Sequence, residues 1–254
     1  MIEPERRGKA CPESRPLLLL LPGLLCDDAT WQSQVEALSA MADCVVASHG
    51  MADSIEAMAR QALHLMPSGQ SFNVAGHSMG GRCALEIARM APERVERLAL
   101  LDTGYQARVP GASAEAEAAQ RMELLDLARR DGMRAMGRQW ARGMVHADQW
   151  DSAVFENILD MVGRFTIEQF EAQIRALLDR PDATQLLPTI RVPTLLVCGR
   201  EDAWSPPARH EQMQLRIPGA RLEIIGNCGH MSTMEQPRAV SQAMANWLAS
   251  GSTQ

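Results

Sequence analysis

The chain has 254 residues, with 25 lysines and arginines against 31 aspartates and glutamates, and a formal net charge of −6 at pH 7. This acidic balance argues against a nucleic-acid-binding protein, which usually presents a basic face. Hydrophobic residues make up 46% and charged residues 22% of the sequence. Such a balance is typical of a globular protein and excludes a disordered or fibrous chain. The length favours one large domain, or a domain with an insertion, over two full domains.

The cysteines and the N-terminal segment indicate in which compartment the protein is expected. The six cysteines contain no CxxC pair and no zinc-like spacing: Cys11, Cys26, Cys44, Cys83, Cys198 and Cys228. We therefore expect reduced thiols and a cytoplasmic protein. Arg6, Arg7 and Lys9 precede the apolar run 17–21, as in a signal peptide, but Pro22 and Gly23 interrupt the run and no cleavage site follows. Because the run is too short to cross a bilayer, we expect a buried strand and no membrane association.

Hydrophobic periodicity alternates between strands and helices along most of the chain. Strands are predicted at 17–21, 44–48, 71–75, 97–101, 194–198 and 221–225. Helices are predicted around 31–38, after a Ser54 N-cap, over 79–90 and after Ser205-Pro206. A last helix is expected to begin at a capping box, Ser232 to Glu235, with Val240, Met244 and Trp247 facing inward. This order predicts an α/β fold with a mostly parallel, doubly wound sheet.

The alternation stops between residues 113 and 181, where only helical patterns occur. Residues 114–130 are rich in strong helix formers. Asp148 is expected to cap a helix that has Trp150, Val154, Ile158 and Met161 on one face, and a second capping box runs from Thr166 to Gln169. We predict a tail over 1–16, a core over 17–112 and 182–250, and an inserted all-helical cap over 113–181. The alternative for the insertion is a helical subdomain with no role at a pocket.

The strongest chemical signal is the sequence GHSMG at 76–80, which follows a predicted strand and opens a predicted helix. A nucleophile elbow needs this order, because the serine sits in strained backbone geometry at the tip of the turn. Gly76 and Gly80 remove side chains that would collide where strand and helix converge. The start of the helix then directs free N–H groups toward a developing negative charge. Ser78 is therefore the candidate nucleophile.

A serine nucleophile needs a base and an acid that orients the base. His230 is the best candidate base, because it lies in a glycine-containing loop after the last strand. The other histidines are assigned to surface or core packing: His49, His64, His77, His146 and His210. Asp202 directly follows the strand 194–198 and is the preferred acid, with Glu201 and Asp102 as competitors. The order Ser78, Asp202, His230 is that of the α/β-hydrolase triad.

These motifs resemble the α/β-hydrolase family, in the branch of small, capped carboxylesterases that includes the biotin-pathway methyl esterase and cofactor-free perhydrolases. The resemblance covers about residues 17–250 and rests on four segments, LLPGLLCDDATW, GHSMGG, GREDAWSP and GNCGHMSTMEQP. It implies an oxyanion hole made by the backbone N–H groups of Leu24 and Met79, and no metal or organic cofactor. Many relatives have histidine where this chain has Pro22, so a residue that usually braces the loop is missing.

The resemblance implies that the insertion selects the substrate. If its large apolar residues line a roof, the pocket suits a small to medium apolar carboxylic ester; these residues are Met122, Met133, Met136, Trp140, Met144 and Trp150. We expect substrate contacts from Leu25, Arg82, Trp140 and Met144, although each side chain could instead pack the cap against the sheet. The expected partner is a small-molecule ester, and the protein is expected to be a monomer or small homo-oligomer.

Two other functions remain open. Arg82, four residues after Ser78, could form an ion pair within its helix, or could receive a substrate carboxylate. An arginine in a similar place does so in the menaquinone-pathway synthase, so a lyase of the same fold is one alternative. A non-hydrolytic ligand receptor is the other, because a fold does not determine function. Serine rather than aspartate at the elbow argues against epoxide hydrolysis and dehalogenation.

Overall fold

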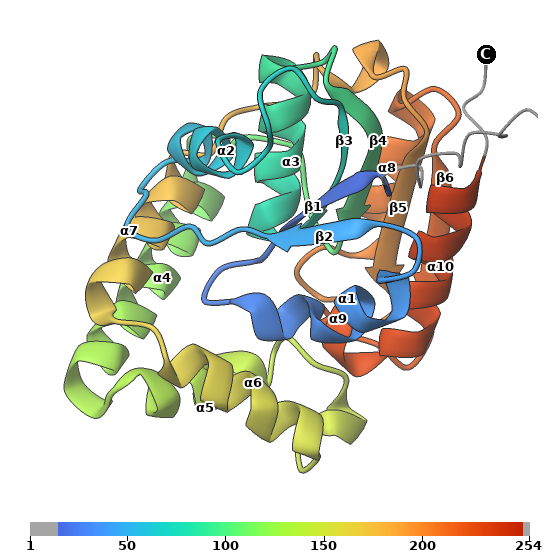
Figure 1. Cartoon of the computed structure of the whole chain (residues 1–254). Coiled ribbons are helices and arrows are strands. Elements are labelled where there is room, and N and C mark those ends of the chain that lie inside the picture. Colours follow the sequence, from blue (N-terminus) through green and yellow to red (C-terminus); the bar gives the residue numbers. More distant parts are fainter. Residues whose placement is uncertain (1–14, 251–254) are drawn as a thin grey trace, which may run out of the picture.

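The computed structural model describes residues 15–250 and has a six-stranded sheet at its centre (Figure 1). All strand pairs are parallel, in the order β2-β1-β3-β4-β5-β6. The strands are β1 (Leu17–Leu21), β2 (Asp43–Val46), β3 (Phe72–His77), β4 (Val95–Leu101), β5 (Thr194–Gly199) and β6 (Arg221–Ile225). The predicted fold class and all six strands are confirmed. The predicted tail, 1–16, lies almost entirely outside the described residues, as does Cys11.

Helices cover both faces of the sheet, as expected for continuous apolar strands. Helices α2 (Ile55–Leu63), α3 (Met79–Met90) and α8 (Pro207–Arg216) cover one face, and α1 (Gln32–Leu38) and α10 (Pro237–Ala249) cover the other (Figure 1). Leu19 and Leu21 of β1 pack into the first layer, whereas Leu18 and Leu20 pack into the second. Alternate side chains of a strand point to opposite faces, so a run of leucines serves both layers.

The start of the last helix differs from the prediction. Residues 232–235 form a separate short helix, α9 (Ser232–Glu235), and α10 begins with Pro237 at its first position. The Ser232 hydroxyl does not cap this helix but donates to Asp102. The predicted capping box is therefore wrong, because Ser232 bonds to Asp102 after β4, and Glu235 accepts from the backbone N–H groups of His146, Gly229 and Met231. The inward positions of Val240, Met244 and Trp247 are confirmed.

Four helices between β4 and β5 lie together beside the sheet (Figure 1). They are α4 (Ala112–Asp131), α5 (Met133–Ala141), α6 (Ala153–Gly163) and α7 (Ile167–Leu178). The capping box from Thr166 to Gln169 is present at the start of α7. The predicted start of α6 is wrong, because Ser152 rather than Asp148 caps the helix, and Trp150 lies before it with 41% of its surface exposed.

Parallel strands bring their carboxyl ends to a single edge of the sheet. The loops after β3, β4, β5 and β6 carry Ser78, Asp102, Asp202 and His230, in that order. These four strands are neighbours in the sheet, so the four side chains gather at one edge. None of the helices within residues 15–250 is both long and apolar enough to cross a membrane.

Candidate active site

The serine lies on a sharp turn between β3 and α3. Its φ of 53° and ψ of −115° are sterically unfavourable for a residue with a side chain. A Cβ on Gly76 would lie 2.2 Å from the Gly80 carbonyl oxygen, and one on Gly80 would lie 2.1 Å from the Leu21 carbonyl oxygen. Both positions therefore require glycine, and the close approach of strand, turn and helix holds Ser78 at the edge of the sheet.

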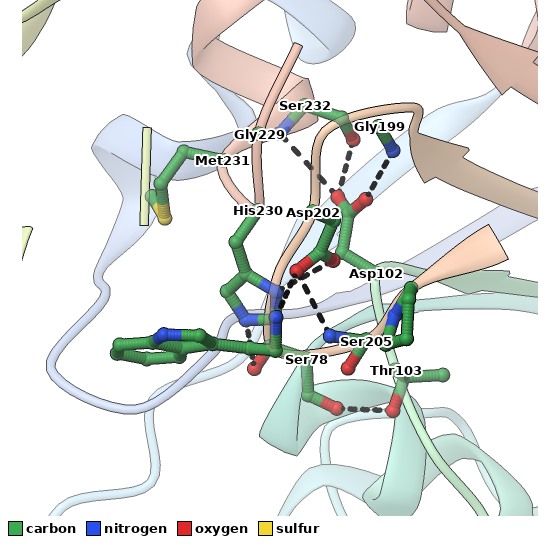
Figure 2. Close-up of polar contacts among 12 residues, drawn as sticks. Ser78, Asp102, Thr103, Gly199, Asp202, Ser205, Gly229, His230, Met231 and Ser232 are labelled. Atoms are coloured by element: carbon green, nitrogen blue, oxygen red, sulfur yellow. Dashed lines mark hydrogen bonds and ion pairs between the residues drawn. The ribbon is translucent and has the colours of Figure 1, made fainter. Parts of the chain in front are cut away.

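Ser78, His230 and Asp202 form a continuous hydrogen-bonded line (Figure 2). The Ser78 Oγ atom lies 2.8 Å from His230 Nε2, and His230 Nδ1 lies 2.8 Å from Asp202 Oδ2. Because an ionised carboxylate only accepts hydrogen bonds, the ring carries its proton on Nδ1 and Nε2 accepts from the serine hydroxyl. This arrangement suits removal of the hydroxyl proton by His230.

The charge of Asp202 controls the protonation of His230. Burial alone lowers the pKa of His230, but the charge and the hydrogen bond of Asp202 outweigh burial and raise it above its ordinary value. Burial raises the pKa of Asp202, yet His230 and the backbone N–H groups of Ser205 and Trp204 bring it below its ordinary value. Those two N–H groups donate to Asp202 Oδ1 at 2.8 Å. Asp202 is thus ionised, and it stabilises the charged imidazole.

The two competing acids, Asp102 and Glu201, accept hydrogen bonds from backbone N–H groups and not from the His230 imidazole. Asp102 accepts hydrogen bonds from the Gly199 N–H at 3.0 Å and from the N–H and hydroxyl of Ser232 (Figure 2). Burial and the nearby charge of Asp202 raise the pKa of Asp102 well above its ordinary value. Glu201 accepts from the Cys228 N–H at 2.9 Å. The carboxylate at the imidazole is therefore Asp202.

Two histidines that the sequence assigns to simple packing hold loops of the site. His77 Nε2 lies 2.8 Å from the carbonyl oxygen of His230, and burial lowers the pKa of His77 to about 3, so the neutral ring donates this bond. His49 Nε2 lies 2.8 Å from the carbonyl oxygen of Pro22. The loop that lacks a histidine at Pro22 is therefore braced by one from the loop after β2. Neither role has a sequence signal, because each partner is a backbone carbonyl distant in the chain.

Leu24 and Met79 lie on the wall of a cavity of about 830 Å³ that also includes Ser78 and His230. Met79 is the first residue of α3, and N–H groups in the first turn of a helix have no partner within that helix. The N–H of the next loop residue, Leu25, donates to the Gln173 side chain of α7 at 2.8 Å. Leu24 and Met79 thus share a cavity wall with Ser78, and the oxyanion hole at these two residues stays a prediction.

The cavity wall differs from the apolar roof that the sequence suggests. Of the four predicted contact residues, Arg82, Trp140 and Met144 line the cavity, whereas Leu25 is fully buried and does not. The other proposed roof residues lie elsewhere: Met133 and Met136 are buried among the insertion helices, and Met122 and Trp150 are exposed. Charged residues of α3, α4 and α8 take their place on the wall.

The insertion contacts the loop that carries His230. The His230 N–H donates to the carbonyl oxygen of Met144, and Glu235 accepts from the N–H groups of His146, Gly229 and Met231 at 2.7 to 3.1 Å. The Trp204 ring lies between Trp140 and His230, with centroid separations of 5.3 and 5.2 Å. The insertion thus directly contacts the edge of the sheet that carries Ser78, Asp202 and His230.

The sequence of the chain is similar to those of known proteins. A model of the alpha/beta hydrolase family matches residues 16–243. The chain is 26% identical over 237 residues to a pimeloyl-[acyl-carrier protein] methyl ester esterase of Nitrosomonas europaea, covering 87% of this chain and 91% of the relative. It is 29% identical over 185 residues to a putative 2-succinyl-6-hydroxy-2,4-cyclohexadiene-1-carboxylate synthase of Bacillus subtilis, covering 69% and 65%.

Solved structures of esterases also resemble this chain. A thermophilic esterase from Thermogutta terrifontis superposes with a TM-score of 0.80 and 28% identity, covering 92% of this chain and 90% of the other. For three of the sequence relatives, the match spans only 62 to 67% of the relative's own length. The esterases among these proteins support a hydrolase of the esterase type. With the family model matching most of its length, the chain belongs to the alpha/beta hydrolase family.

Proposed function

We propose that the protein is a serine carboxylesterase that cleaves small-molecule esters through an acyl-enzyme on Ser78. The observation that carries this proposal is the line from Ser78 Oγ to His230 Nε2 and from His230 Nδ1 to Asp202, with 2.8 Å at both steps. A hydroxyl in this position can lose its proton to the imidazole as it attacks a carbonyl carbon. The esterases among its relatives point to the same chemistry.

In the first half of the reaction, Ser78 Oγ bonds to the carbonyl carbon and its proton moves to His230 Nε2. The backbone N–H groups of Leu24 and Met79 receive the oxyanion, and one such donor typically lowers the barrier by about 2.7–4 kcal/mol. The tetrahedral adduct then breaks its bond to the alcohol oxygen, which leaves with the proton from His230. Asp202 stabilises the imidazolium throughout.

In the second half, water replaces the alcohol. His230 takes a proton from water as its oxygen attacks the acyl carbon, and then returns that proton to Ser78 Oγ. The carboxylic acid leaves and the enzyme is restored. Trp140, Met144 and Arg82 contact the substrate, because they line the cavity that opens at Ser78. Every group that the cycle needs comes from the chain and water.

The lyase of the same fold is the second candidate. Two observations favour it: the putative synthase among the relatives, and the position of Arg82 on the cavity wall. The two functions differ in covalent chemistry, because a lyase that removes a proton from carbon needs no acyl-enzyme. A lyase specialised for a dicarboxylate should also leave neutral esters untouched. A receptor would bind its ligand without turnover.

Initial rates on p-nitrophenyl acetate, butyrate and octanoate test the proposal. Wild type should hydrolyse at least one ester, and Ser78→Ala should lose a factor on the order of 10⁶ in kcat, as removal of a nucleophile can cost. Ser33→Ala, on the exposed side of α1, is the matched control and should keep full activity. Wild-type inertness toward all three esters, or full activity of Ser78→Ala, would contradict the proposal.

A further inference from the structure

The cavity wall beside Ser78 is unusually rich in guanidinium groups. Five arginines from four parts of the fold line it: Arg82 of α3, Arg121 and the exposed Arg130 of α4, Arg180 after α7 and Arg209 of α8. The acidic residues on the same wall all belong to α4, namely Glu117, Glu123 and Asp126, and the last two are exposed. The inner wall therefore carries more positive than negative charge.

Glu117 compensates only two of these arginines. Its carboxylate accepts from Arg121 at 2.9 Å and from both terminal nitrogens of Arg180 at 2.7 and 2.8 Å. Burial opposes ionisation of Glu117, but the two arginines outweigh it and lower its pKa to about 2. Even so, the Nε atom of Arg180 is buried and has no hydrogen-bond partner within residues 15–250. One carboxylate shared by two guanidinium groups leaves a net positive charge.

Arg82 and Arg209 converge on the other side of the cavity. A Cβ on Gly104 would lie 2.9 Å from Arg82 Nη2 and 3.3 Å from Arg209 Nη1, so both guanidinium groups reach this one point of the backbone. Each donates to a carbonyl oxygen at 2.9 Å, Arg82 to Gln106 and Arg209 to Trp204. Neither forms an ion pair with a carboxylate in the described part of the chain.

The two acids that interact electrostatically with Arg82 are engaged elsewhere. Glu117 pairs with Arg121 and Arg180, and Asp182 accepts from the Thr184 and Ala107 N–H groups. Burial and the charges of Arg180 and Arg209 lower the pKa of Arg82 to about 9, so the side chain remains cationic at neutral pH. Two adjacent cations with spare N–H donors and no anion form a binding site for an oxyanion.

The position of this pair relates it to the reaction. Arg82 lies one helical turn after Ser78 on α3, about 6 Å along the helix axis. The Thr103 hydroxyl donates to the Ser78 carbonyl oxygen at 2.6 Å (Figure 2). The next residue is Gly104, where the two guanidinium groups meet. Ser78, Arg82 and Arg209 line the same cavity, so one substrate can meet all three.

We propose that the ester substrate carries a carboxylate, which Arg82 and Arg209 bind while the ester carbonyl lies at Ser78. This inference rests on the proposed function and specifies its substrate class. The ion pairs of Glu117 hold Arg121 and Arg180 in place on the cavity wall. Because one carboxylate does not neutralise all the arginines, the wall favours an anionic substrate over a neutral one.

The test compares charged and neutral esters of equal size. Mono-p-nitrophenyl glutarate and its methyl ester place the charge on the acyl part, and 4-(butanoyloxy)benzoate and its methyl ester place it on the alcohol part. The readout is the ratio of kcat/KM for the charged ester to that for the neutral one. Arg82→Met and Arg209→Met should each lower this ratio by about tenfold to a hundredfold, either for the acyl-charged pair or for the alcohol-charged pair, because each variant weakens binding of the charged ester far more than that of the neutral one.

Arg216→Met is the matched control, since Arg216 belongs to the same helix as Arg209 but lies outside the cavity wall and is exposed. It should leave both ratios unchanged. Neutral-ester turnover also reports correct folding of each variant. Ratios that stay unchanged in both arginine variants, or fall equally in the control, would overturn the inference. Failure of the serine mechanism would look different, because Ser78→Ala would then keep its activity on every ester.

Discussion

At the scale of single residues, the proposed mechanism makes activity depend on the buried pair of His230 and Asp202. His230 is 3% and Asp202 2% exposed, so water screens their interaction only weakly. Desolvation acts against the charged imidazole and Asp202 acts for it, and the balance raises the pKa of His230. Only the neutral imidazole can accept the serine proton, so activity should be lost as the pH falls through this raised pKa.

We therefore expect kcat/KM for a neutral ester to fall below an apparent pKa that is higher than the ordinary 6.5 of histidine. Asp202→Asn removes the charge but keeps the shape. In this variant burial dominates, the acidic limb should move to lower pH, and kcat should fall by about 10⁴. A pH–rate profile of both proteins measures this. A limb that stays in place in Asp202→Asn would show that Asp202 does not control the base.

Several residues of the site could be predicted because the pattern that reveals them is local. Ser78 stands between two glycines and between a strand and a helix, and Asp202 and His230 each lie in the loop that follows a strand. His77 and His49 could not be predicted, because they bond to carbonyl groups of His230 and Pro22, and every residue has such a group. The arginine pair is equally hidden, since Arg82 and Arg209 meet only when α3 and α8 pack on one face.

At the scale of elements, the geometry of the β3–α3 turn depends on the absence of side chains. The backbone of Gly80 approaches the Leu21 carbonyl so closely that no Cβ fits. This contact joins the start of α3 to the end of β1, the strand that leads to Leu24. It therefore connects the turn that carries Ser78 with the loop that carries Leu24, the proposed second oxyanion donor.

Gly80→Ala should destabilise the protein by about 3 kcal/mol, the upper end for overpacking, because a backbone oxygen cannot move aside as a side chain can. Gly163→Ala in α6 is the matched control: its Cβ would meet only Arg134 Cβ, at an ordinary 3.7 Å. Replacing glycine by alanine in a helix is favourable by up to about 1 kcal/mol. Urea unfolding measures both. Equal stability of Gly80→Ala and wild type would contradict the assigned contact.

The helical elements also show where local sequence signals fail. The capping box from Thr166 to Gln169 forms as predicted, because nothing else competes for its side chains. The equivalent pattern from Ser232 to Glu235 does not form, because Asp102 binds Ser232 and three backbone N–H groups bind Glu235. A capping signal is therefore reliable only where tertiary partners leave its side chains free.

At the scale of the whole molecule, the insertion and the sheet share one hydrophobic core. Phe170 of α7, Phe155 of α6 and Met136 of α5 belong to the same buried cluster as Leu19 and Leu21 of β1. Strand alternation and the helical character of the insertion could be predicted, because both follow from the period of the apolar residues. The charged cavity wall could not, because periodicity does not show which polar faces turn toward each other.

A shared core predicts that the insertion and the sheet unfold together. Phe170 is 1% exposed, and Phe170→Ala should destabilise the whole protein by about 3–5 kcal/mol. Calorimetry should show one transition, lowered by roughly 6–20 °C for a chain of this size. Phe165 precedes α7 and is only partly buried, so Phe165→Ala should have a smaller effect. A separate early transition, with the main one unmoved, would mean that the insertion is an independent unit.

The proposed function requires that Ser78 carry the acyl group during turnover. Rapid acid quenching of the enzyme with p-nitrophenyl butyrate, followed by peptide mass spectrometry, tests it directly. We predict a butyryl group on the peptide that contains Ser78, and none in Ser78→Ala. Ester turnover with no acylated peptide, or with the butyryl group on another residue, would contradict the account.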